Sequence, residues 1–291
     1  MHMKNIFKSA LVLVATVSVV ACNVENIGTT YDPAENGSAV SFVQTVVNNT
    51  TLPASTTSYN VVIGRSNASV AETVNLVSTL PDGMCPSSVS FAAGESSANI
   101  VLDLSTLNVG TTCKGIIGIE RQADFSRDVI NVTLAKAYEW TSLGTGEFLE
   151  NFWEGFVADV EIIKAEGFDI YRVLNPYAEA SEGTGKGPAY IQFEIVDKAK
   201  GIVHFDTFTT NFDYDGGGNF VKGYRPSEAS ASYAAYDDYS LIDSNYYVAL
   251  VPYWYVDGVG GWGVKYGYTI GIALPGAPKS IVDWFDENGL L

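Results

Sequence analysis

Apolar and polar residues alternate in short segments along residues 38 to 136, and turn-forming residues separate the segments. Val89 and Phe91 follow this two-residue period, as do Ile100, Leu102 and Leu104. Such alternation is typical of β-strands that bury one face. Its recurrence about every ten residues predicts a seven-stranded β-sandwich over residues 38–137. The predicted strands are 38–44, 57–65, 71–79, 87–94, 97–105, 113–121 and 128–136.

The pattern changes near residue 137, where aromatic residues become dense and the five tryptophans begin. Residues 190–197 alternate again, and residues 201–214 follow after a polar turn. Phe148, Phe152 and Phe156 recur every four residues, which favours a short helical interval over 147–157. The chain as a whole is therefore predicted to be all-β. Residues 138–291 are predicted to form an aromatic-rich β-barrel or a second β-sandwich.

The most aromatic stretch, residues 251–276, reads as a hairpin because the glycines at 258, 260 and 261 can supply positive φ values. After the turn, alternate residues from Trp262 to Leu274 are apolar and share one face. We therefore expect Trp262 and Tyr266 to be buried. Before the turn the sides are not decided, so Tyr253, Trp254 and Tyr255 are candidates for exposure and ligand contact.

The first 21 residues read as an export signal. Lys4 and Lys8 precede an apolar run that is too short to span a bilayer. The sequence VVAC at residues 19–22 resembles the lipobox of bacterial lipoproteins, which implies a lipidated Cys22 (palmitate among its acyl chains) as the new N-terminus. Each buried methylene of such a chain contributes about 0.8 kcal/mol of membrane affinity. Residues 22–37 are polar and rich in Gly, Pro and Asn, as expected for a tether.

The charge balance is strongly acidic. Without the two signal lysines, 14 basic residues face 33 acidic ones, a net charge of −19. A nucleic-acid partner needs a basic face, so this class of partner is excluded. The lipid anchor is expected to hold the protein at a membrane, predicted to be the outer membrane, on its cell-surface or periplasmic face.

Two cysteines remain in the mature chain, Cys85 and Cys113. An even number of cysteines in an exported protein allows a disulfide between them. Two reduced thiols in the core are the alternative.

Two stretches resemble modules of Bacteroidota-type surface lipoproteins. Val89, Phe91, Gly94 and Glu95 match the strand–turn–strand of immunoglobulin-like and Calx-β-like modules, which implies that the sandwich is immunoglobulin-like. The order W-x-x-L-G-x-G … Y-R-x-x-N-P-Y, from Trp140 to Tyr177, is similar to a C-terminal domain of the same lipoproteins. The resemblance implies a β-rich extracytoplasmic domain near glycan-uptake systems and brings no catalytic residue with it.

Catalytic motifs are missing from the sequence: there is no Gly-x-Ser-x-Gly, HExxH or paired CxxC. His204 lies between apolar residues and reads as a residue of a sheet. With 33 acids, a carboxylate pair for glycoside hydrolysis stays open, although none stands out. The sequence therefore predicts a protein that is not an enzyme.

A metal candidate lies at residues 213–219, where Asp213, Asp215 and Asn219 could offer oxygen ligands to Ca²⁺. The same Asp and Gly residues form simple turns between strands. We favour the turn, and no cofactor is expected.

The function that composition, compartment and resemblance favour is glycan binding by a lipoprotein accessory to an outer-membrane uptake system. Aromatic rings stack on sugars while polar neighbours bind hydroxyls. Besides residues 253–255, the candidates are Tyr236, Asp237, Asp238 and Tyr239. A structural or protein-interaction subunit of a cell-surface complex is the alternative, and a carboxylate-dependent glycoside hydrolase comes third.

Overall fold

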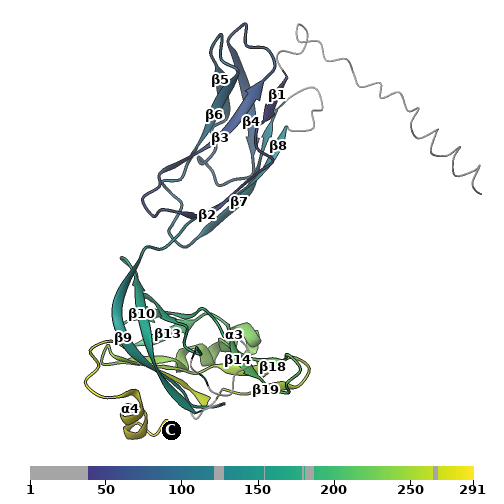
Figure 1. The fold of residues 1–291 in the computed structure, drawn as a ribbon. Helices are drawn as coiled ribbons and strands as arrows, with labels where there is room; N and C mark the ends of the chain where they lie inside the picture. Colours follow the sequence, from purple (N-terminus) through teal and green to yellow (C-terminus); the bar gives the residue numbers. More distant parts are fainter. Residues whose placement is uncertain (1–38, 121–127, 154, 179, 181–186, 265–267) are drawn as a thin grey trace, which may run out of the picture. The chain divides into compact units, whose positions relative to one another are not determined.

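The computed structural model describes residues 39–120, 128–153, 155–178, 180, 187–264 and 268–291 (Figure 1). The protein is all-β, as predicted, with 51% of the described residues in strands and 9% in helices. It divides into two compact units, Met1–Ala137 and Tyr138–Leu291. The predicted signal peptide (residues 1–21) and the whole predicted tether (residues 22–37), which begins with Cys22, lie outside the described residues. No helix among the described residues is long and apolar enough to cross a membrane.

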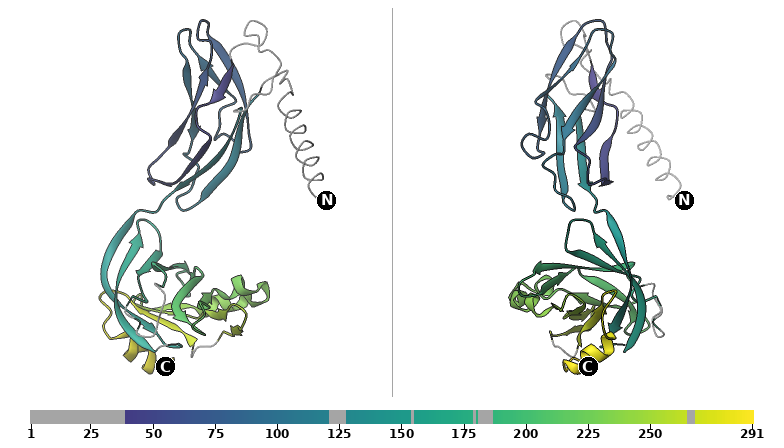
Figure 2. Two further views of the ribbon diagram at one scale, coloured as in Figure 1. Left: turned by 45° about the vertical axis from the view of Figure 1, so that its right-hand side comes forward. Right: turned by 90° about the vertical axis from the view of Figure 1, so that its left-hand side faces the viewer.

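Two sheets that face each other build the N-terminal unit, as the views in Figure 2 show. One has three strands in the order β1-β3-β6, and the other has five in the order β2-β8-β7-β4-β5. The strands are β1 (Val40–Phe42), β2 (Val46–Leu52), β3 (Ser58–Arg65), β4 (Glu72–Ser78), β5 (Ser88–Phe91), β6 (Ser97–Asp103), β7 (Thr112–Ile119) and β8 (Val129–Lys136).

Each of the seven expected segments contains a strand, but the unit has an eighth strand, β2. The prediction of seven strands is therefore wrong in number. The missed strand holds the polar run 48–51, which sequence analysis takes for a turn, and it pairs in parallel with β8. Only Val47 and Leu52 of β2 are buried in the core between the two sheets, beside Phe42, Phe91 and Ile117.

The second unit contains a closed eight-stranded barrel, which decides between the two predicted architectures. The strand order around the barrel is β10-β11-β12-β13-β16-β17-β20-β9. The strands are β9 (Trp140–Glu150), β10 (Phe156–Ala165), β11 (Ile170–Leu174), β12 (Tyr190–Asp197), β13 (Ile202–Phe205), β16 (Leu241–Asp243), β17 (Tyr247–Leu250) and β20 (Ile270–Ala273).

A separate four-stranded sheet, in the order β14-β15-β18-β19, packs against the barrel. Its strands are β14 (Phe208–Asp213), β15 (Phe220–Tyr224), β18 (Tyr253–Val256) and β19 (Gly260–Trp262). Phe208 of β14 and Trp254 of β18 belong to the same buried cluster as Phe148 and Phe193 of the barrel. Between β15 and β16 lie the short helix α3 (Pro226–Ala229) and the 3₁₀ helix η1 (Ala231–Tyr239).

The expected helix over 147–157 is wrong, because this segment is the β9–β10 hairpin. The buried Glu150 carboxylate accepts hydrogen bonds from the backbone N–H groups of Phe152 and Trp153, at 2.9–3.0 Å, and so stabilises the tight connection. The four-residue spacing of phenylalanines thus comes from two strands and a turn.

The expected continuous strand from Trp262 to Leu274 is divided between two sheets. Trp262 pairs with Trp254 in the β18–β19 hairpin, whereas β20 closes the barrel between β17 and β9. Ile270 and Ile272 fill the barrel, and helix α4 (Ile281–Glu287) covers the opposite face of β20.

Candidate functional site

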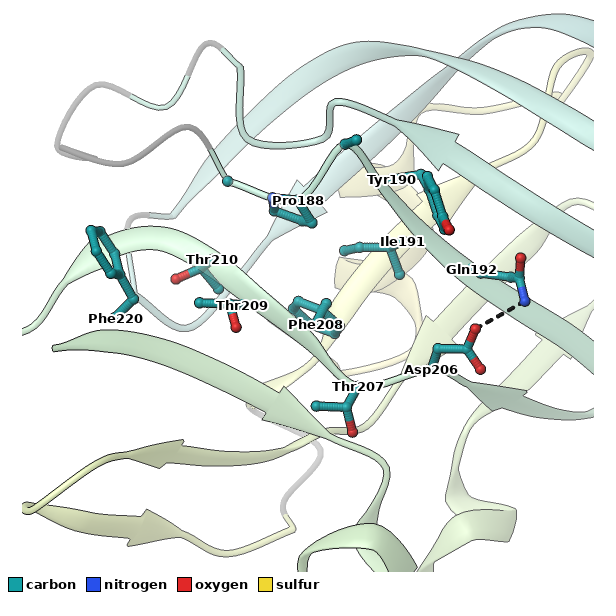
Figure 3. A pocket seen from close by; sticks show the side chains of 12 residues that line it. Pro188, Tyr190, Ile191, Gln192, Asp206, Thr207, Phe208, Thr209, Thr210 and Phe220 are labelled. Carbon is teal, nitrogen blue, oxygen red and sulfur yellow. Dashed lines mark hydrogen bonds between the residues drawn. The ribbon is translucent and has the colours of Figure 1, made fainter. Parts of the chain in front are cut away.

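A cleft of about 550 Å³ opens where the barrel and the four-stranded sheet separate (Figure 3). One wall consists of residues 187–192, which include the start of β12. The other wall consists of residues 206–210, which follow β13 and include the start of β14, together with Phe220 of β15. Strands β12 and β13 pair up to Phe193 and Phe205. Beyond this pair, residues 206–210 turn toward the other sheet, and the cleft lies in the gap.

Both ends of the cleft are closed by contacts between the two walls. At one end the Asp206 N–H donates to the Gln192 carbonyl at 3.0 Å. At the other end Gly187 has a φ of +64°, and a Cβ built there would lie 2.9 Å from the Tyr177 Cβ and 3.6 Å from the Asn211 Cβ. The Asn211 amide in turn donates to the Tyr177 carbonyl at 3.0 Å. The opening therefore spans only a few residues of each wall.

The floor of the cleft is apolar and its rim is polar. Ile191 and Phe208 are buried, whereas Tyr190, Thr207 and Thr209 are exposed. The alternation of β12 causes this division, because Ile191 points into the barrel core while Tyr190 and Gln192 point outward. An apolar floor with a few hydrogen-bonding groups is the usual composition of a small-molecule site.

One side of the rim is a chain of polar contacts across three segments. Arg172 of β11 donates to the Gln192 side chain at 2.8 Å. The Gln192 amide donates to the Asp206 carboxylate at 2.9 Å (Figure 3). Partial burial raises the pKa of Asp206, and the nearby charge of Glu228 adds to the effect, while Arg225 and Arg172 oppose it. The hydrogen bond from Gln192 holds the Asp206 carboxylate at the rim of the cleft.

Helix α3 supports the neighbouring part of the rim, at Thr207. The Thr207 hydroxyl hydrogen-bonds the Glu228 carboxylate, which also forms an ion pair with Arg225 at 3.0 Å. Arg225 in turn lies 3.4 Å from the buried carboxylate of Asp237. This network ties Thr207 to α3 and η1, so the rim is held on both sides by side-chain contacts.

The prediction that Trp254 is a candidate for exposure and ligand contact is wrong. Its side chain is fully buried, and its indole N–H donates to the Tyr268 carbonyl at 2.8 Å. Trp262, expected to be buried, is only half-buried. Tyr266 lies outside the described residues. The β18–β19 hairpin shows the reason: Trp254 faces the barrel and stacks against Phe152.

Tyr253 and Tyr255 alternate with Trp254 and are half-buried on the other side of β18. Tyr253 stacks on Tyr233 at 5.5 Å and covers Gly261, whereas Tyr255 lies 6.1 Å from Tyr224. Tyr253 and Tyr255 are therefore each packed against another tyrosine ring. They face away from the core but do not line the cleft.

The other predicted candidates lie on η1. Tyr236 is 38% exposed and contacts Tyr239 and Tyr233 edge-on or tilted. Asp238 is exposed, 3.7 Å from His204. Asp237 is buried and accepts hydrogen bonds from the Ser227 N–H and hydroxyl at 2.8 and 2.5 Å. Asp237 therefore joins α3 to η1, and its carboxylate is already engaged.

The candidate calcium loop forms a hydrogen-bonded turn between β14 and β15. Asp215 accepts from the Gly217 N–H at 2.9 Å and from the Asn219 amide at 2.8 Å, and Asp213 accepts from the Gly218 N–H at 2.9 Å. These bonds, the one from Asn219 first, lower the pKa of Asp215. In the part of the chain that the structure describes, no group of three His, Cys, Asp or Glu side chains is placed to hold a metal ion.

The two cysteines of the N-terminal unit are free thiols, so the predicted disulfide is not formed. The buried Cys113 contacts the Met84 sulfur at 3.5 Å, whereas the half-buried Cys85 lies against the Pro86 carbonyl at 3.5 Å. Burial raises the pKa of both thiols, which makes them less reactive. They behave as small apolar residues at the edge of the core.

Sequence reasoning placed Tyr190 and Gln192 on a strand but did not identify them as site residues, and it did not single out Asp206. The alternation of apolar and polar residues shows that Tyr190 and Gln192 face outward. It does not indicate that the chain leaves the barrel after β13 to form β14. The cleft comes from that separation, which only the three-dimensional pairing reveals.

Comparisons with known proteins give little guidance. No family model and no curated protein matches the chain. A solved structure described as "Crystal structure of calcium binding domain CBD12 of CALX1.1" is similar over 59% of this chain and 80% of that chain. The identity is 10% and the TM-score 0.29, a similarity too low to support any inference about fold or function.

Proposed function

We propose that the protein is a lipid-anchored, extracytoplasmic binding protein whose cleft holds part of a glycan, as an accessory to an outer-membrane uptake system. The observation that carries the proposal is the cleft between β12 and β14, with its apolar floor and its rim of Tyr190, Gln192, Asp206 and Thr207. Sugars present apolar ring faces and many hydroxyls, which this combination can bind.

The remaining features support the same assignment. The export signal and Cys22 place the chain at a membrane, and the N-terminal unit acts as an immunoglobulin-like spacer. In this proposal the residues 213–219 serve as a turn between β14 and β15, stabilised by hydrogen bonds to Asp213 and Asp215. Asp206 serves to bind hydroxyls, Glu228 holds Thr207 in place, and the protein releases its ligand unchanged.

Affinity electrophoresis in gels that contain soluble polysaccharides, together with a glycan array, tests the proposal. We expect the mature protein to be retarded by at least one polysaccharide. Thr209→Trp, which fills the cleft from its exposed rim, should abolish the retardation. Thr112→Trp, at an exposed position of β7 in the other unit, is the matched control and should leave it unchanged.

Other outcomes separate the alternatives. Failure with every glycan, together with a co-purifying membrane protein, would favour an interaction subunit. New reducing ends that vanish in Asp206→Asn would favour a hydrolase. Membrane attachment is checked separately: Cys22→Ala should move the protein from the detergent phase to the aqueous phase.

A further inference from the structure

A row of aromatic side chains runs along the outside of the barrel toward the cleft. Phe168, in the β10–β11 turn, contacts Tyr138 edge-on with ring centroids 5.1 Å apart. Tyr138 contacts Trp140 of β9 in the same manner at 5.8 Å. All three lie in the second unit, and Phe168 is 38% exposed while the other two are half-buried.

Arg172 connects this row to the cleft. Its guanidinium lies 4.0 Å from the ring of Trp140 and 3.8 Å from the ring of Tyr190, so it is stacked between the two. The hydrogen bond from Arg172 to Gln192 fixes the guanidinium in this position. Tyr190 is 39% exposed and lines the cleft. Tyr190 therefore belongs to the cleft and, through Arg172, extends the aromatic row, so the row and the cleft form one continuous surface.

The charges around this surface are mostly negative. Asp206 accepts a hydrogen bond from the Gln192 amide at 2.9 Å, and Glu194 lies two positions from Gln192 along β12, on the same outward face. In keeping with these positions, burial raises the pKa of Tyr138, and the carboxylates of Glu194 and Asp206 add to the rise. The cation of the row, Arg172, is already enclosed by two rings and Gln192. A polyanionic glycan would be repelled by these carboxylates, whereas a neutral glycan would meet hydrogen-bond acceptors.

We propose that the surface binds a linear, neutral polysaccharide lengthwise. The cleft holds the first one or two sugars, and Tyr190, Trp140, Tyr138 and Phe168 contact the sugars that follow. The inference rests on the proposed function and names its ligand class. A platform of aromatic residues outside the cleft adds affinity only when the ligand is long enough to reach it.

The test uses oligosaccharides of two, four and six sugars cut from a polysaccharide that retards the protein, measured by isothermal titration calorimetry. We expect the hexasaccharide to bind at least tenfold more tightly than the disaccharide. Phe168→Ala, at the far end of the row, should weaken binding of the hexasaccharide severalfold and leave the disaccharide unchanged. Trp140→Ala should remove most of the gain from length.

Tyr236→Ala is the control, because Tyr236 is equally exposed but lies on η1, which contributes no residue to the lining of the cleft despite the sequence-based prediction. It should change neither affinity. Equal affinities for the three lengths would overturn the inference and leave the proposed function intact. The same holds if Trp140→Ala and Phe168→Ala weaken binding of the disaccharide and of the hexasaccharide by the same factor. Retention by anionic polysaccharides alone would also overturn it. If no polysaccharide retards the wild-type protein, the proposed function itself fails, and the inference fails with it.

Discussion

Trp254 is the largest side chain that the protein withdraws completely from water. It packs between Phe152, whose ring stacks on it at 5.9 Å, and Phe208, whose ring meets it edge-on at 5.8 Å. Its indole N–H is also paired, with the Tyr268 carbonyl. The residue therefore fastens the four-stranded sheet to the barrel through packing and one hydrogen bond.

Replacing Trp254 with alanine should lower the free energy of unfolding by about 3–5 kcal/mol, because it removes a buried ring and leaves a cavity. Urea denaturation followed by circular dichroism measures the change. Tyr236→Ala, on the exposed side of η1, should change it by less than about 0.5 kcal/mol. A loss below about 1 kcal/mol in Trp254→Ala would show that the ring is not part of the core.

Because of Asp206, the stability of the fold should decrease as the pH rises, which is the opposite of the usual effect of a carboxylate. Its pKa is raised in the folded protein, so the fold favours the protonated carboxyl. That contribution is fully present below the ordinary pKa of aspartate, about 3.9, and is lost as the pH rises through the raised value. Asp206→Asn, which cannot ionise, should therefore have a higher melting temperature than the wild type at pH 7, and the difference should vanish near pH 4.

Asp215→Asn is the control of opposite sign. Hydrogen bonds from Asn219 and Gly217 lower the pKa of Asp215, so its contribution is present at neutral pH and is lost as the pH falls through the lowered pKa. This variant should be less stable than the wild type at pH 7. A lower melting temperature at pH 7 in Asp206→Asn would contradict the environment that the structure gives that carboxyl.

At the scale of elements, β20 is covered on both faces. The barrel core lies on one side, and on the other side the Ile281 and Phe285 side chains of α4 lie directly over Gly271. A Cβ built on Gly271 would lie 2.6 Å from the Phe285 ring and 2.8 Å from Ile281. Glycine is required here because the helix approaches the strand so closely.

Gly271→Ala should lower the free energy of unfolding by about 1–3 kcal/mol, since the added methyl group must displace α4 from the strand. Gly263→Ala is the matched control: a Cβ there meets no atom within 4 Å, and the backbone is not left-handed. It should leave the midpoint of urea denaturation almost unchanged. Equal midpoints for the two variants would show that α4 does not pack on β20.

The alternation of apolar residues was enough to find most strands. It failed where pairing with a distant strand, or packing against another element, decides the structure. The strand β2 was missed because its Asn and Thr residues are set in place by pairing with β8. Parity grouped Trp254 with Val256, both fully buried, but could not say which side faces the core. The ring of Phe285 that covers Gly271 of β20 belongs to helix α4, which sequence analysis did not predict.

At the scale of the whole molecule, the second unit joins a closed barrel to an open sheet, and the candidate site lies at their junction. Sequence analysis left barrel and sandwich open, because closure depends on which strands are neighbours. Asp206 and Tyr190, 16 positions apart, come together only because β12 and β13 pair and then separate. The cleft is thus a property of topology, which local patterns do not contain.

The most direct test of the central claim is hydrogen–deuterium exchange of the mature protein with and without a neutral polysaccharide that retards it. We predict slower exchange in residues 187–192 and 206–210, and weaker protection around residues 138–140 and 168, with η1 and the N-terminal unit unchanged. Protection confined to residues 233–239 or to the N-terminal unit, with the cleft unchanged, would contradict the account.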